Sequence, residues 1–385
     1  MIPVDGDVTK TCTRCVMDTS VREIQFDSDG VCNFCTAAIT RLKRDLFLGP
    51  EHDGKLAKLL SDIREAGKGK RYDCLIGVSG GVDSSYTAWL VRREFGLRPL
   101  AIHLDNGWNS ELAVQNIERL LKALDIDLHT HVIDWEEFRD LQLSFLKSSI
   151  ANSEIPTDHG ITAILYKEAA RNGIKYIING GNLATEVVMP ESWMHDAKDL
   201  RLLKSVHRRH GTKPLRTFPM MSYGRLAWYI LVRRIRFVGI LNYIRYDKDQ
   251  AAEILERELG WRRYAAKHFE SIYTRFFQGY LLPNKFGMDK RRPHYSSLIV
   301  SGQMTRDQAL KLLSDDPYDS SVAQEDLLYV RKKFGLSESQ FDEIMATPPC
   351  SAEDYPNTTR WLRLMAPIVG VIKDLATSRD RSPRR

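Results

Sequence analysis

A short run of glycine, serine and aspartate, placed directly after the apolar residues Leu75–Val78, could bind a phosphate. The run contains Ser79, Gly80, Gly81, Asp83, Ser84 and Ser85. Glycines let the backbone approach a phosphate, serine hydroxyls donate hydrogen bonds, and a helix starting near Val82 adds free N–H groups and its positive dipole end. The lysine and the Gly-Lys-Ser/Thr ending of a Walker A loop are missing. The run therefore predicts a phosphate-binding turn between a strand and a helix, with an ordinary strand-to-helix turn as the alternative.

Four cysteines near the N-terminus have the spacing of a zinc ribbon. They form two Cys-x-x-Cys pairs, Cys12 with Cys15 and Cys32 with Cys35. Each pair places two thiolates on one turn, and two such turns supply the four sulfur ligands of a structural Zn²⁺ site. So small a unit has little core of its own, so metal binding would drive its folding. Free thiols, disulfides and an iron–sulfur cluster are the alternatives.

The elements that must position these residues alternate between strands and helices. We predict strands at 72–78, 98–104, 127–133 and 175–179, and helices at 83–95, 111–124 and 158–171. This alternation predicts an α/β fold with a doubly wound parallel sheet. Ligands of such sheets bind beyond the carboxyl ends of the strands. The residues that follow three of these strands should therefore meet at one cleft.

Two of those strand ends carry candidate ligand contacts. His103 and Asp105 end the second strand, and the last predicted strand leads into Gly180, Gly181, Asn182 and Glu186. The glycines would let the backbone approach a ribose or a phosphate, and Thr185 or Glu186 could point at the cleft. Asp105 could instead cap a helix, and the glycines could form an ordinary turn.

Two further segments have open interpretations. Asp158 is either the N-cap of the helix at 158–171, a role that Thr157 could also fill, or a contact to substrate or metal. The segment from Leu282 to Ile299 concentrates cations in a loop marked by glycine and proline; its chemistry-bearing residues are Lys285, Asp289, Arg291, Arg292 and His294. Adjacent cations are costly unless an anion or an acidic face neutralises them, although a solvated loop is the alternative.

Sequence pattern divides the chain into four parts. We predict a zinc ribbon at 1–40, a nucleotide-binding domain at 41–188, a mostly helical domain at 189–373 and a disordered tail at 374–385. The apolar stretch at 226–246 approaches the length of a membrane span, but four arginines interrupt it. We therefore predict an amphipathic helix there, whose outer face is exposed to solvent, a partner or an anionic membrane.

Composition restricts the class of protein. The chain has 385 residues, 43% of them hydrophobic, and a net charge of +6. These values are typical of a globular protein with an anionic substrate, and the charge is too small to indicate nucleic acid by itself. The N-terminus lacks the basic start and apolar core of a signal peptide, so we expect a cytoplasmic protein with reduced cysteines.

Taken together, these motifs resemble those of the N-acetyl sugar amidotransferase family, within the ATP pyrophosphatase superfamily. The resemblance rests on the four-cysteine ribbon and on three motifs: Gly77-Val-Ser-Gly-Gly-Val-Asp-Ser84, Asn179-Gly-Gly-Asn182…Glu186, and Phe286-Gly-Met-Asp-Lys-Arg-Arg-Pro-His294…Ser301-Gly-Gln-Met-Thr-Arg306. It implies an adenine nucleotide alpha hydrolase-like fold. It also implies that the enzyme uses ATP to turn the acetamido group of a nucleotide-activated sugar into an acetamidino group, in surface glycan or O-antigen biosynthesis.

The resemblance also implies roles for the residues. Ser79, Gly80, Gly81, Ser84 and Ser85 would hold pyrophosphate, Asp83 and Asp105 would hold Mg²⁺, and His103, Gly180 and Gly181 would contact the nucleotide. Lys285, Arg291 and Arg292 would stabilise developing negative charge, and Asp158, Asn182, Glu186, Asp289 and His294 would bind the sugar substrate. The chain shows no glutaminase nucleophile, so ammonia would come from a glutaminase subunit through a cyclase-like channel subunit, similar to those of histidine biosynthesis.

Two other classes remain open. ATP-dependent tRNA thiolation enzymes combine the same loop with Cys-x-x-Cys modules, but they need a further sulfur-handling cysteine, and only Cys74 and Cys350 remain here. A dense basic and aromatic RNA-binding surface is also not evident. A non-catalytic zinc-ribbon interaction protein would leave the phosphate-binding loop without a role.

Overall fold

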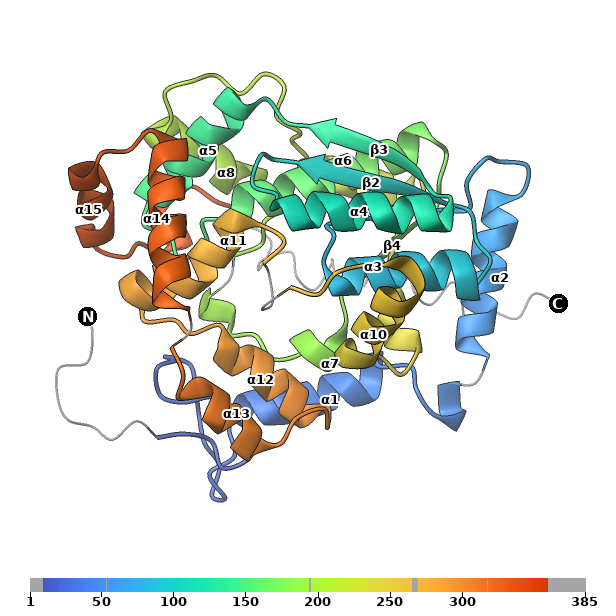
Figure 1. Ribbon diagram of the computed structural model, residues 1–385, viewed down its shortest axis with the longest axis horizontal. Coiled ribbons are helices and arrows are strands. Elements are labelled where there is room, and N and C mark those ends of the chain that lie inside the picture. Colours follow the sequence, from blue (N-terminus) through green and yellow to red (C-terminus); the bar gives the residue numbers. More distant parts are fainter. Residues whose placement is uncertain (1–9, 53, 194, 265–268, 317, 359–385) are drawn as a thin grey trace.

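The computed structural model describes residues 10–358, with the exception of 53, 194, 265–268 and 317. Five parallel strands form a single sheet in the order β3-β2-β1-β4-β5. Their bounds are Cys74–Gly77 (β1), Pro99–Asp105 (β2), Asp127–Val132 (β3), Tyr176–Asn179 (β4) and Arg236–Gly239 (β5). The predicted parallel α/β sheet is confirmed, with β1 at its centre (Figure 1).

Helices cover both faces of the sheet. Their bounds in the first half of the chain are Asn33–Asp45 (α1), Lys55–Gly67 (α2), Val82–Trp89 (α3), Glu111–Leu124 (α4), Trp135–Lys147 (α5), Ile155–Arg171 (α6) and Leu183–Glu186 (α7). Those of the second half are Leu200–His210 (α8), Tyr223–Leu231 (α9), Lys248–Leu259 (α10), Ile272–Phe276 (α11), Arg291–Val300 (α12), Arg306–Leu313 (α13), Ser320–Phe334 (α14) and Glu338–Ala346 (α15). The mostly helical character predicted for the C-terminal region is confirmed.

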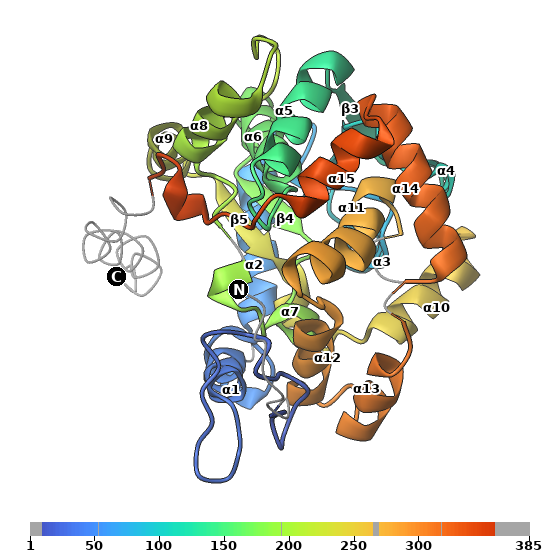
Figure 2. The same ribbon diagram turned by 90° about the vertical axis from the view of Figure 1, so that its left-hand side faces the viewer.

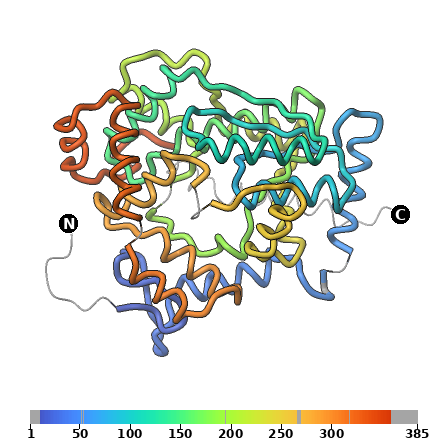
Figure 3. Tube along the Cα trace, viewed as in Figure 1, coloured from blue at the N-terminus to red at the C-terminus, as the bar shows by residue number. Residues whose placement is uncertain are grey.

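Successive side chains of the strands belong to two separate hydrophobic cores, one on each face of the sheet. In β1, Leu75 belongs to a cluster that includes residues of α5, α6 and α8, whereas its neighbour Ile76 belongs to a cluster that includes residues of α3, α4 and α10. Successive side chains of a strand point to opposite faces, so a continuous apolar run fills both layers. The chain path in Figure 3 and the turned view in Figure 2 show these layers, with the N-terminal segment lying beside α12.

The prediction of one amphipathic helix at 226–246 is wrong. Helix α9 ends at Leu231, the chain turns through Arg234, whose φ is 54°, and β5 then pairs with β4. A left-handed residue ends the helix, and the β-branched and aromatic residues that follow favour a strand. Across the described ranges, no helix is long and apolar enough to cross a membrane. The predicted tail at 374–385 lies outside the described residues.

Helix α6 also begins earlier than predicted. Its N-cap is Glu154, and Pro156 lies in its first turn, where a proline costs no backbone hydrogen bond. Neither Thr157 nor Asp158 is therefore the N-cap. This places Glu154 and Asp158 four residues apart at the start of one helix.

Candidate active site

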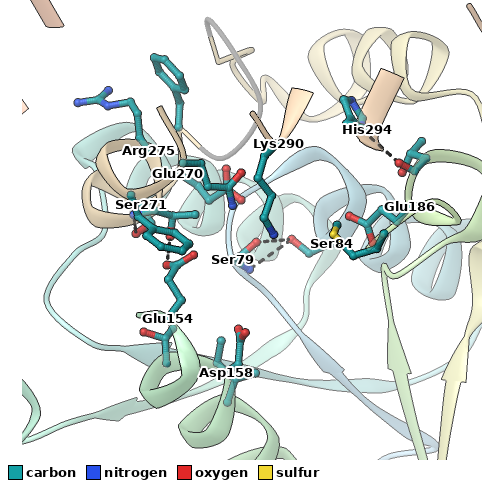
Figure 4. A pocket seen from close by; sticks show the side chains of 18 of the residues that line it. Ser79, Ser84, Glu154, Asp158, Glu186, Glu270, Ser271, Arg275, Lys290 and His294 are labelled. Atoms are coloured by element: carbon teal, nitrogen blue, oxygen red, sulfur yellow. Dashed lines mark hydrogen bonds between the residues drawn. The ribbon is translucent and has the colours of Figure 1, made fainter. Parts of the chain in front are cut away.

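A cavity of about 1190 Å³ lies at the carboxyl ends of β1, β2 and β4. Residues from α6, α7, α11 and the start of α12 complete its wall (Figure 4). Eight of the predicted site residues line it: Ser79, Ser84, His103, Asp158, Glu186, Asp289, Arg291 and His294. The cavity therefore contains residues of the strand ends, which the sheet topology was expected to bring together. It also contains residues of a segment more than 100 residues further along the chain.

The phosphate-binding loop is held by its own hydroxyls. The Ser84 hydroxyl accepts a hydrogen bond from the Ser79 backbone N–H (3.2 Å) and contacts the Ser79 hydroxyl (3.1 Å). Gly80 has a φ of +82°, and a Cβ there would lie 2.8 Å from the Ala113 carbonyl oxygen. Only glycine fits this turn. Ser85 does not line the cavity: its hydroxyl is buried, and it has no hydrogen-bond partner among the residues that the structure describes.

The glycines after β4 bring that strand close to the loop. A Cβ on Gly180 would lie 2.7 Å from the Asp83 carbonyl carbon, so a larger residue would push β4 away from the start of α3. Asn182 caps α7, because its side-chain oxygen accepts the Thr185 backbone N–H at 2.9 Å. Gly180, Gly181 and Asn182 do not line the cavity. Their contacts are those of residues that position their neighbours.

Two carboxylates lie near the start of α3. Asp83 accepts a hydrogen bond from the Tyr246 hydroxyl, and burial together with the negative charges of Asp83 and Glu186 raises the pKa of Tyr246. Both carboxylates thus act on one phenol beside the loop. Mg²⁺ prefers carboxylate oxygens combined with phosphate oxygens, so this donor set fits a magnesium ion bound with a nucleotide.

His103 and Asp105, both near the carboxyl end of β2, have different roles. The ring Nε2 of His103 contacts the Asn109 side-chain amide (3.0 Å), and its Nδ1 contacts the Val78 carbonyl (2.9 Å). Because an amide N–H donates, Nε2 is the acceptor and the Nδ1–H donates to Val78. Asp105 instead accepts the Gly107 backbone N–H at 2.9 Å and shapes a turn. It does not line the cavity.

An acidic cluster lies opposite the loop, made of the predicted Asp158 and of two residues that sequence reasoning missed, Glu154 and Glu270. Glu154, Asp158 and Glu270 all line the cavity. Burial and the charge of Asp158 raise the pKa of Glu154 to about 8, although the Thr274 hydroxyl donates to its carboxylate at 2.6 Å. The spacing of Glu154 and Asp158, four residues apart at a helix start, could have revealed this pair.

Lys290 is a second functional residue that was missed. It lies beside the predicted Asp289 and Arg291, and it extends into the cavity toward Ser79 and Ser84 (Figure 4). Its positive charge lowers the pKa of Glu154, which places it near the acidic cluster as well. A cation between a phosphate loop and a carboxylate can stabilise charge that develops on a phosphoryl group.

Thr185 and His294 form another part of the wall. The His294 Nδ1 contacts the Thr185 carbonyl oxygen at 3.1 Å. The Thr185 hydroxyl is buried, lines the cavity and has no hydrogen-bond partner within the described part of the chain. An unsatisfied buried hydroxyl costs free energy, and a ligand that fills the cavity would satisfy it.

The other predicted cations are held by contacts outside the cavity or along its wall. Lys285 donates to the carbonyls of Ile344 and Thr347 near the end of α15, and burial lowers its pKa to about 8. Arg291 lines the cavity but is paired with Asp289 at 2.8 Å. Lys285 is therefore a helix C-terminal cap, which the geometry does not bring to the cavity.

Arg292 contacts the ribbon instead of the cavity. Its guanidinium pairs with the buried carboxylate of Asp18 at 2.9 Å and donates to the Val16 carbonyl at 2.9 Å. Arg306 donates to the carbonyls of Cys12 and Cys15 at 3.0–3.2 Å. These two arginines, which we call the ribbon clamp, attach the C-terminal region to the cysteine turns.

The four cysteines converge as a metal site requires. Their side chains are buried, and all four sulfur atoms lie within 4.8 Å of one another. The Sγ atoms of Cys12 and Cys35 are 3.9 Å apart, and those of Cys15 and Cys32 are 3.6 Å apart. Four ligands at about 2.3 Å from Zn²⁺ lie about 3.8 Å from each other in a tetrahedron, so this cluster fits zinc.

The C-terminal region of the chain matches a known family model. Residues 270–367 match the model described as LPS biosynthesis protein WbpG-like, C-terminal domain. This region is therefore similar to the C-terminal domain of WbpG-like proteins. The match includes Lys290, His294 and the ribbon clamp, and it confirms the resemblance to the amidotransferase family. The cavity and the clamp thus contain residues of this matched region, which we call the WbpG-like region for its similarity.

Curated relatives share only part of this chain. An uncharacterised protein of Methanocaldococcus jannaschii is 28% identical over 181 residues, which are 45% of this chain and 59% of that protein. A glutamine-hydrolysing GMP synthase of Pyrobaculum aerophilum is 27% identical over 184 residues, 48% of this chain and 34% of that one. The chain thus spans 59% of the length of the first relative and 34% of the second, which is less than two thirds of either.

Solved structures give more distant similarities. The NH3-dependent NAD synthetase of Campylobacter jejuni is 14% identical, with a TM-score of 0.32, over 73% of this chain and 95% of that one. The NMN synthetase of Francisella tularensis is 18% identical, with a TM-score of 0.28, over 57% of this chain and 89% of that one.

Proposed function

We propose that this protein is an ATP-dependent amidotransferase that converts the acetamido group of a nucleotide-activated sugar into an acetamidino group. The observation that carries the proposal is the shared cavity: Ser79 and Ser84 of the phosphate loop face the same space as Lys290 and His294 of the WbpG-like region. Its 1190 Å³ exceeds the roughly 300–1,000 Å³ of a site for one small molecule. The cavity has room for ATP together with a second substrate.

The first step activates a poor electrophile. The acetamido oxygen attacks the α-phosphorus of ATP, a new O–P bond forms, and the bond to the β-phosphoryl group breaks, so pyrophosphate leaves and an adenylated imidate remains. Ser79, Ser84 and the N–H groups at the start of α3 hold the pyrophosphate. Lys290 stabilises the charge that develops on the phosphoryl oxygens. Asp83 and Glu186 would hold Mg²⁺, which neutralises the phosphates when it is bound.

The second step introduces nitrogen. Ammonia attacks the imidate carbon, the nitrogen loses one proton, and the C–O bond breaks so that AMP leaves and the amidinium group forms. Glu154 is positioned to accept that proton, because its carboxylate lines the cavity and its pKa of about 8 suits a general base. Thr185 and His294 contact the sugar substrate in this proposal.

The experiment that tests the proposal measures pyrophosphate release by the purified chain with ATP, Mg²⁺ and ammonium chloride. UDP-diacetamido-mannuronic acid and CMP-pseudaminic acid are compared as sugars. We expect AMP to form, and one of the sugars to become lighter by about one mass unit as oxygen is replaced by NH. Pyrophosphate release without any change in sugar mass would contradict the proposal.

Ammonia supply forms a second arm of that experiment. We propose that a glutaminase subunit and a cyclase-like channel subunit deliver ammonia to this chain. Free ammonium should therefore support turnover, and glutamine should support it only after the partners are added. Turnover of the purified chain with glutamine alone would contradict this.

Thiolation of tRNA is less well supported by the cavity. Cys74 is buried within β1, where burial raises the pKa of its thiol, and Cys350 is exposed. Among the residues that the structure describes, no cysteine lines the cavity. A sulfur-transfer step would need such a thiol.

A further inference from the structure

The stretch from residue 200 to residue 246 has an unusual charge. It contains 11 Lys and Arg residues and no Asp or Glu, whereas the whole chain carries +6. The rest of the chain therefore carries −5. Such asymmetry indicates a surface that meets an anionic partner.

Part of this charge is neutralised by α5. Lys213 pairs with Glu136 at 2.5 Å, and the backbone of the same loop donates to Asp140 and Glu137. The remaining cations are different. In the part of the chain described by the structure, no carboxylate pairs with Arg201, Lys204, Arg208, Arg225 or Arg234.

Three of these cations line a second cavity. Arg201, Lys204 and Arg208 lie on one face of α8, at helical spacing, and line a space of about 640 Å³ together with the residues that begin α9. Ser222 caps α9 and lies in this wall. Three cations beside a helix N-terminus fit a phosphate group.

Large apolar side chains are exposed on α9, directly after it and on β5. Trp228, Ile230, Leu231, Val232 and Phe237 are 38–63% exposed. The Arg225 guanidinium lies over the Trp228 ring, 5.4 Å from its centroid, so cation and aromatic group share one surface. Figure 2 shows α8 and α9 together at one edge of the molecule.

We propose that this face, made of α8, α9 and the start of β5, binds the surface of an anionic membrane. A basic rim around exposed Trp, Leu and Val is the pattern of a helix that lies in the headgroup region. A lipid surface of this kind requires only one sign of charge, together with apolar side chains that can enter the headgroup region. The stretch from 200 to 246 offers only one sign.

The position of this face relative to the active-site cavity indicates what membrane binding would do. Phe237 is both exposed on this face and part of the lining of the active-site cavity. Its ring stacks on Tyr166, which in turn stacks on Tyr229 of α9. Docking through α9 would therefore place the cavity close to the membrane surface.

The test is sedimentation of the full chain with vesicles. We expect it to bind vesicles that contain phosphatidylglycerol, to bind phosphatidylcholine vesicles weakly, and to dissociate as salt is raised. Replacing Arg201, Lys204 and Arg208 by Glu should weaken binding at least 100-fold, since each basic residue near an anionic surface contributes about fivefold. The matched control reverses three exposed lysines elsewhere, Lys122, Lys311 and Lys332, and should bind more than tenfold better than that variant.

A second pair of variants tests insertion of the apolar side chains. Leu231→Ser with Val232→Ser should weaken binding, whereas Val114→Ser with Leu328→Ser, at 51% and 54% exposure, should not. Equal binding of both pairs would overturn insertion. If the wild-type chain does not bind phosphatidylglycerol vesicles, or binds both vesicle types equally, the proposal fails, and an acidic protein becomes the partner to test.

Discussion

The phosphate loop and the cation-rich segment from Leu282 to Ile299 were both interpreted from sequence as binding machinery, but the serines that shape the loop contact each other, whereas arginines in and just after the segment contact distant parts of the chain. Ser79 and Ser84 bond to each other five residues apart. Arg292 instead contacts Val16, and Arg306 contacts Cys12, nearly 300 residues away. A loop whose geometry is set by its own residues can be interpreted from sequence, whereas a cluster of cations cannot be interpreted before its partners are known.

The largest effect should come from the loop. Ser79→Ala combined with Ser84→Ala removes two hydroxyls that line the cavity, and we expect pyrophosphate release to fall about 1000-fold, since one oriented donor contributes about 10²–10³. The control is Ser85→Ala, which removes a buried hydroxyl without a hydrogen-bond partner in the described part of the chain. Its rate should stay within about twofold of the wild type. A large loss in this control would show that the loop is arranged differently when ATP is bound.

Two lysines of the WbpG-like region can be compared as the cation that acts at the phosphate loop. Lys285 was predicted from sequence, whereas Lys290 lines the cavity in the structure. Lys290→Met should lower kcat for pyrophosphate release about 100-fold, because it removes a cation that points at the loop. Lys285→Met removes a cation that caps α15 and should leave kcat unchanged while it lowers the unfolding temperature. Steady-state kinetics and thermal unfolding of both variants measure this. The reverse result would restore Lys285 to the site.

Glu154 should control how the rate depends on pH. With a pKa of about 8, its carboxylate is mostly protonated at pH 7 and becomes a base as pH rises, so the ammonia-dependent step should speed up through about pH 8. Glu154→Gln should remove this step and lower the rate about 10- to 100-fold at pH 9. The free ammonia concentration is held constant across the series, so that its own ionisation does not mimic the profile.

The same pKa shift predicts a change in stability. The folded pKa of Glu154 lies above the ordinary 4.5, so the folded state binds the proton more tightly than the unfolded state does. Stability should therefore fall as pH rises from about 4.5 to about 8, and the loss should persist above that range. Glu154→Gln should lack this loss, which thermal unfolding at pH 5 and pH 9 can show.

Sequence pattern was sufficient to predict most of the strands of the sheet, the turn of the phosphate loop and the convergence of the four cysteines. The first four strands, the loop and the cysteine turns follow from local spacing. β5 was missed because its four residues follow a helix inside one apolar stretch, and the left-handed Arg234 that separates them has no local sequence signal. Glu154 was missed because its raised pKa depends on burial and on the nearby charge of Asp158, which arise only when the chain is folded.

A variant of the ribbon clamp should affect the retention of zinc more than the rate. Arg292→Ala leaves the carboxylate of Asp18, which is 2% exposed on its side chain, without its cation. Such an unpaired buried charge destabilises a protein by about 3–5 kcal/mol, and here the strain falls on the cysteine turns. We expect kcat to stay within about twofold while excess Zn²⁺ is present, and a chelator to remove zinc faster than from the wild type. If the variant instead lost pyrophosphate release with its zinc retained, Arg292 would act in catalysis, and the distinction between loop and clamp would disappear.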